Sequence, residues 1–158
     1  MNNLPEEWVS DPNMAEVKLS YKTKPESRNN PILCCPGDAY EYLTEIWDQD
    51  TIELQEQFVV ILLNTAKRVI GWSKISTGGS TATIVNPTNV MQVAVLSNAN
   101  SIILAHNHPS SHNRPSTADI RLTRRIQQSL REVAITVDDH LILMPDGGYY
   151  SFNENGKL

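Results

Sequence analysis

One stretch constrains this chain more than any other: a short apolar run that ends in two histidines. Residues 101–105 (SIILA) have the length and composition of a buried strand. His106 and His108 follow directly, and side chains two residues apart on a strand point to the same face. Both imidazoles can therefore bind one ion, and Pro109 ends the strand behind them.

A helix start shortly after this strand offers a third ligand. Ser116 is a favourable N-cap, which puts Asp119 at the third helical position, in the first turn. Three protein ligands leave the fourth tetrahedral position of a zinc ion to water, as in catalytic rather than structural sites. We therefore predict one Zn²⁺ per chain on His106, His108 and Asp119, although iron or manganese could load the same set. In the alternative interpretation the histidines are polar residues at a strand end, and Asp119 completes a capping box with Ser116.

The longer stretch HNHPSSHNRPSTADIRLT, residues 106–123, resembles the JAMM (MPN+) metallopeptidase signature H-x-H-x7-S-x2-D. It is more similar to the RadC-like branch of the JAB/MPN+ family, which begins H-N-H-P-S-G and continues after a short gap with P-S-x-x-D-I-x-L-T. The chain departs from this pattern chiefly at Ser111, where the family usually has glycine. The similarity covers roughly residues 51–156 and is specific.

The resemblance implies an α/β fold in which helices flank a mixed central sheet, the JAB/MPN architecture that is similar to cytidine deaminases. The pattern along the chain predicts the same class, because strands and helices alternate. Strands are expected at 14–21, 58–63, 69–75, 81–85, 101–105, 135–144 and 149–152, and helices at 38–48, 90–98 and 116–133. Asp38 is the expected N-cap of the first helix.

Two parts are assigned along the chain. Residues 1–50 are expected to form an N-terminal arm, strand and helix, and residues 51–158 the RadC-like metal-binding domain. Bacterial RadC proteins often carry a helix-hairpin-helix segment before this domain, and we expect that DNA-binding segment to be missing here. The net charge of −5 also argues against a general nucleic-acid binder, which is usually basic.

Cysteine usage and hydropathy indicate a cytoplasmic protein. Cys34 and Cys35 are the only cysteines, and their adjacency fits neither a disulfide framework nor a C-x-x-C metal knuckle. A reduced pair is the expectation. The sequence has no signal-peptide pattern and no apolar run of membrane-spanning length, so no membrane partner is expected. Nothing in the sequence indicates an oligomeric state.

A hydrolytic zinc site also needs a base that takes a proton from the attacking water. The resemblance assigns this role to Glu56, with Glu53 as a rival because spacing to the histidines cannot be judged in sequence. It also implies that Ser116 hydrogen-bonds the oxyanion. The implied activity is that of a zinc metallopeptidase or isopeptidase, in which zinc-bound water attacks an amide carbonyl of a peptide or protein substrate.

Three further polar residues are not predicted to be ligands. His112, in the loop between the ligands, is expected to be exposed, with a transient metal or substrate contact as the alternative. Asp139 or His140 could orient a ligand, or His140 could be a core or strand-edge histidine. The arginines of the 116–133 helix form a solvated face or a docking face for an acidic partner.

Three other functional classes fit the sequence less well. A nuclease is suggested only by the letters H-N-H, which true HNH nucleases spread over separate elements. A zinc deaminase needs H-x-E and a later P-C-x-x-C, and no cysteine follows Cys35. A non-enzymatic accessory domain, associated with DNA repair or a protein partner, could keep the metal site. The complete ligand set together with Glu56 favours the enzyme.

Overall fold

The computed structural model describes residues 28–78 and 85–158. The strand expected at 14–21, and all but the last residue of the strand expected at 81–85, lie outside this part of the chain. The described elements are α2 (Pro36–Ile46), β1 (Gln57–Leu63), β2 (Val69–Thr77), α3 (Pro87–Leu96), β3 (Ser101–Asn107), α4 (Thr117–Arg131), β4 (Thr136–Leu143) and β5 (Tyr149–Ser151). Each agrees with an expected element to within a few residues.

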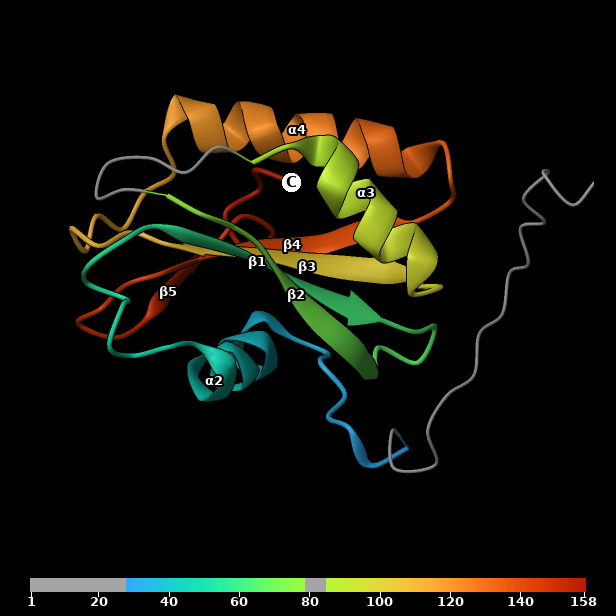
Figure 1. Ribbon diagram of the computed structural model, residues 1–158, viewed down its shortest axis with the longest axis horizontal. Coiled ribbons are helices and arrows are strands. Elements are labelled where there is room, and N and C mark those ends of the chain that lie inside the picture. Colours follow the sequence, from blue (N-terminus) through green and yellow to red (C-terminus); the bar gives the residue numbers. More distant parts are fainter. Residues whose placement is uncertain (1–27, 79–84) are drawn as a thin grey trace, which may run out of the picture.

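The strands form one mixed sheet in the order β2-β1-β3-β4-β5. β1 runs antiparallel to both β2 and β3, and β4 runs antiparallel to β5. β3 and β4 are parallel, so the chain must cross between them, and α4 provides that connection. The predicted α/β class with a mixed central sheet is confirmed (Figure 1).

Helices cover both faces of this sheet, with α2 on one side and α3 and α4 on the other (Figure 1). Val59, Ile61 and Leu63 of β1 belong to the core under α2, whereas the alternate residues of β1 belong to the core under α3 and α4. Burial on both faces explains why β1 and β3 are buried at every position and read as continuous apolar runs.

The start of α2 differs from the prediction. Cys35, not Asp38, is the N-cap, and the helix begins at Pro36. Proline is favoured in a first helical turn because the backbone N–H that it lacks would have no helical partner there. Asp38 instead lies at the third position, where its Oδ2 accepts the backbone N–H groups of Cys34 and Cys35 at 2.7 and 3.1 Å. Both cysteines are free thiols, as expected of a reduced pair, and both are exposed.

The register between β1 and β3 places the start of β1 beside the end of β3 at one edge of the sheet. Phe58 near the start of β1 pairs with His106 near the end of β3. The first turn of α4 reaches the same edge, since Asp119 contacts His106. Among the described residues, no helix is long and apolar enough to cross a membrane.

Candidate metal centre

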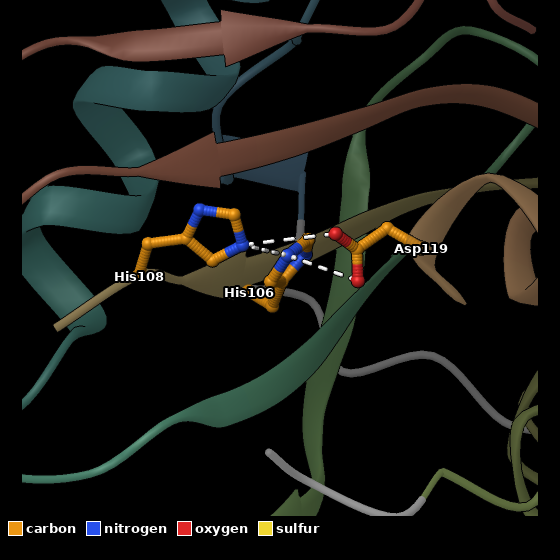
Figure 2. A group of neighbouring side chains, drawn as sticks. All are labelled: His106, His108 and Asp119. Atoms are coloured by element: carbon orange, nitrogen blue, oxygen red, sulfur yellow. Dashed lines mark hydrogen bonds and ion pairs between the residues drawn. The ribbon is translucent and has the colours of Figure 1, made fainter. Parts of the chain in front are cut away.

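His106 lies in β3, His108 directly follows this strand, and Asp119 lies in the first turn of α4. Their side chains point toward one another (Figure 2). One ligand atom each of His106, His108 and Asp119 lies within 4.8 Å of the others. His106 Nε2 is 3.0 Å from His108 Nε2 and 3.6 Å from Asp119 Oδ1, and His108 Nε2 is 3.7 Å from Asp119 Oδ2. The structure thus brings together the three residues that the sequence selected as ligands.

The backbone of β3 sets the two imidazoles on one side. β3 ends at Asn107, and His108 continues its line because the His108 N–H donates to the Leu143 carbonyl of β4 at 3.0 Å. His106 is buried and His108 half-buried. One imidazole therefore faces the protein interior, and the other lies at the boundary with solvent.

A capping box orients Asp119. Ser116 is the N-cap of α4, and its Oγ accepts the Asp119 backbone N–H at 3.1 Å. In return Asp119 Oδ2 accepts the Ser116 N–H at 2.7 Å, which holds the carboxylate so that Oδ1 faces His106. Burial favours a higher pKa for Asp119, but its bonds with the two imidazoles outweigh this effect and hold the pKa far below its ordinary value. Capping and ligation are compatible uses of one carboxylate.

The loop between the ligands determines the tautomer of His108. His108 Nδ1 is 2.7 Å from the carbonyl oxygen of His112, and a carbonyl can only accept, so Nδ1 carries the hydrogen. This leaves Nε2 facing Asp119. Burial favours a lower pKa for His108, but bonds to Asp119 and His112 and the charges of Asp119 and Glu56 outweigh it and raise the pKa. The His112 ring itself is exposed, as expected.

The ring of His106 contacts another histidine, His140, which is fully buried. His140 Nε2 is 2.8 Å from His106 Nδ1, and His140 Nδ1 is 2.6 Å from Thr123 Oγ1. Burial holds the pKa of His140 well below its ordinary value. Asp139 turns toward β5 instead, accepting the Ser151 hydroxyl at 2.6 Å and the Asn153 N–H at 2.9 Å. Of these two neighbours, His140 is the one that contacts a candidate ligand.

Glu56 lies directly before β1 and is half-buried. Since Phe58 pairs with His106, continuing the antiparallel register by two residues puts Glu56 beside His108. Its negative charge contributes to the raised pKa of His108. Glu53 is an exposed residue of the preceding turn. The geometry thus favours Glu56 over Glu53 as the acidic group near the imidazoles.

Sequence reasoning missed Asn107, which is fully buried between the two histidines. Its Oδ1 accepts the Gln57 N–H at 2.7 Å, and its Nδ2 donates to the carbonyls of Ile52 and Gln55 at 2.6 and 3.0 Å. These bonds hold the backbone on both sides of Glu56. The signal was available, because a polar side chain inside an apolar strand needs buried partners.

Thr123 was also missed. It lies on the buried face of α4, at the position four residues after Asp119, and its hydroxyl donates to the Asp119 carbonyl at 2.7 Å. A buried threonine on an otherwise apolar helix face indicates a hydrogen-bond partner on a neighbouring element. Its partner on β4, His140, depends on tertiary packing that the sequence pattern does not show.

Known proteins resemble this chain over most of its length. The family model of the RadC-like JAB domain matches residues 33–157 and so includes α2, while our boundary at residue 51 stays a prediction. A UPF0758 protein of Symbiobacterium thermophilum is 43% identical over 126 residues, which are 80% of this chain and 52% of the relative. One of Alkaliphilus metalliredigens is 41% identical over 146 residues, 92% of this chain and 61% of the relative. The chain spans about half the length of the curated relatives it matches. The chain therefore belongs to the RadC-like JAB domain family.

Proposed function

We propose that this domain is a zinc-dependent hydrolase of the metallopeptidase or isopeptidase type, acting on an amide bond of a peptide or protein. The observation that carries the proposal is the convergence of His106, His108 and Asp119 ligand atoms within 4.8 Å. Two imidazole nitrogens and one carboxylate oxygen are a donor set of catalytic zinc. Membership in the JAB domain family supports the same class of chemistry.

The spacing of the three ligands fits the ion. Zinc bonds of about 2.0–2.1 Å in tetrahedral geometry separate ligand atoms by about 3.3–3.4 Å. The two imidazole nitrogens are 3.0 Å apart, and they lie 3.6 and 3.7 Å from different oxygens of Asp119. With one ligand atom from each residue the separations stay within 4.8 Å, so tetrahedral zinc would need the Asp119 carboxylate to turn one oxygen toward both imidazoles.

The surrounding residues can carry the proton transfers. When bound, zinc would polarise the scissile carbonyl and lower the pKa of a water to about 7. The Glu56 carboxylate, beside His108, would take a proton from the attacking water and return it to the leaving amine. The Ser116 oxygen accepts the Asp119 N–H through a lone pair, so its own hydrogen can be donated to the oxyanion.

A partner-binding accessory domain is the second candidate, and one observation favours it. Arg121, Arg124 and Arg125 are exposed on α4, and none of them forms an ion pair within residues 28–78 and 85–158. An unpaired basic face suits an acidic partner. This candidate does not require turnover.

Metal content of the purified protein tests the main proposal. We expect about one zinc per chain, as in other three-ligand sites, lost in His108→Ala and kept in Glu56→Gln. Asn113→Ala is the control, because it changes an exposed residue of the same loop. Wild type that stays free of zinc after reconstitution would refute the hydrolase and leave partner binding.

Turnover is tested separately with libraries of quenched fluorescent peptides and isopeptides. We expect Glu56→Gln to lower kcat by about 10²–10⁴-fold, the usual contribution of a general base. Glu53→Gln, an identical chemical change at an exposed position, should leave kcat unchanged. The reverse result would assign the base to Glu53. Zinc binding without hydrolysis of any substrate would favour the accessory domain.

A further inference from the structure

We infer that Thr123 and His140 are positioning residues: they form a hydrogen-bond chain of fixed direction that holds His106 in the tautomer presenting Nε2 to the metal. The inference rests on the proposed function, because it takes His106 as a ligand. Both residues would prepare the ligand without touching the metal or the substrate.

The direction of the hydrogen-bond chain is set at Thr123. Its hydroxyl has one hydrogen and two close partners, the Asp119 carbonyl oxygen at 2.7 Å and His140 Nδ1 at 2.6 Å. A carbonyl oxygen can only accept, so the hydrogen must go to Asp119. The Thr123 oxygen therefore accepts from His140, and His140 Nδ1 carries a hydrogen.

His140 fixes the direction of its hydrogen bond with His106 because its ring is neutral. The ring is fully buried and packs against Phe152 and Phe58, with centroids 4.6 and 5.5 Å away. Within the described residues, its nitrogens bond a hydroxyl and an imidazole but no carboxylate. An imidazolium here would be a buried charge with no carboxylate hydrogen-bonded to it, which is strongly unfavourable. With its one hydrogen on Nδ1, His140 presents the Nε2 lone pair.

His106 is then the donor in the last bond. Its Nδ1–H donates to His140 Nε2 at 2.8 Å, so its own Nε2 holds a lone pair. That atom is the one 3.0 Å from His108 Nε2 and 3.6 Å from Asp119 Oδ1. Ligating histidines are usually held in this way by a bond at the second ring nitrogen.

The hydrogen-bond chain also joins two candidate ligands, Asp119 and His106. It begins at the backbone carbonyl of Asp119 and ends at the ring of His106, whose Nε2 faces the carboxylate of the same Asp119. The first turn of α4 and the end of β3 are thus connected through β4 as well as across the candidate metal position. A change at Thr123 should therefore alter His106 through His140.

Imidazole ¹⁵N shifts of the 158-residue chain report these tautomers directly, before and after zinc is added. We expect Nδ1–H, with Nε2 unprotonated, for both His106 and His140 in the wild type. In Thr123→Val, which has nearly the shape of threonine but no hydroxyl, we expect a mixture of tautomers at His106 and a zinc Kd about 10–100-fold higher, the usual effect of losing such a partner. Thr123→Ser should restore both properties.

The outcomes separate this inference from the proposed function. An Nε2–H tautomer of His106 in the wild type would overturn the chain, and so would a Thr123→Val protein with unchanged shifts and zinc affinity. The expected tautomers in a wild type that binds no zinc would support the chain and overturn the hydrolase. If Thr123→Val does not fold, the wild-type shifts and the Thr123→Ser variant still decide the direction.

Discussion

Asn107 and Gln57 are joined across two strands, because the Asn107 side-chain oxygen accepts the Gln57 backbone N–H at 2.7 Å. The nitrogen of the same amide donates to the carbonyls of Ile52 and Gln55. A single buried side chain, located between the two candidate histidine ligands, therefore holds the segment that contains Glu56. The position of Glu56, the proposed base, therefore depends on this buried amide.

Asn107→Asp tests this arrangement with an isosteric change. The variant keeps an acceptor for Gln57 but places a second acceptor against two carbonyls, so we expect the free energy of unfolding to fall by about 2–4 kcal/mol. Urea denaturation measures this loss. Asn113→Asp, the same change at an exposed loop position, should stay within about 0.5 kcal/mol of wild type. Equal effects at the two positions would contradict the bracing role of Asn107.

Ser116 is the N-cap of α4 and the proposed oxyanion donor, and a change to glycine can separate these two roles. Glycine at an N-cap costs only a few tenths of a kcal/mol relative to serine, whereas loss of an oxyanion donor lowers kcat by about 10²–10³-fold. Ser116→Gly should therefore keep the thermal midpoint near that of wild type and lose most of the activity. Calorimetry and peptide hydrolysis on the same preparation measure both quantities. A variant with wild-type kcat would leave Ser116 with capping alone.

Zinc affinity should depend on pH through His108. Its pKa is raised above the ordinary value of 6.5, so a proton occupies the imidazole up to a higher pH and must leave when a metal binds. Affinity is therefore expected to fall as the pH drops through this raised pKa and to level off above it. Competition with a chromophoric chelator at a series of pH values measures the trend. An affinity independent of pH between 6 and 8, roughly the range in which histidine titrates, would contradict it.

Ser111 offers a stability test of the family pattern. Its φ is +56°, a left-handed conformation that costs a residue with a Cβ about 1–2 kcal/mol and glycine almost nothing. Glycine also gives the unfolded chain more conformational entropy, which offsets part of this gain. Ser111→Gly should therefore raise the free energy of unfolding by about 0.5–1 kcal/mol. Ser110→Gly, one residue earlier and outside the left-handed region, should lower it. Destabilisation by both changes would mean that Ser111 is not strained.

The sequence was sufficient where the site depends on local geometry. The alternation of a strand places His106 and His108 together, and an N-cap serine places Asp119 in the first turn, so both features follow from spacing alone. The apolar runs of β1 and β3 likewise identified the two strands at the centre of the sheet.

The sequence was insufficient where the site depends on which strands pair. The contact of His140 with His106 requires β4 to lie parallel to β3, and the bonds of Asn107 require a particular register with β1. The misplaced start of α2 has a different cause. Asp38 has the chemistry of an N-cap, but Pro36 extends the helix ahead of it and moves its carboxylate to the third position.

Asp119 is both part of the capping box of α4 and a candidate metal ligand, so ion binding there would be linked to the integrity of a whole helix. The carboxylate of Asp119 closes the first turn of a 15-residue helix, and Ile126 and Leu130 further along it fill the core on one face of the sheet. Unwinding that turn would also release any ion that the carboxylate holds, so the binding energy is added to the cost of fraying. Occupancy of the candidate metal centre should therefore slow deuterium exchange at the amides of that turn, whether or not any substrate is cleaved.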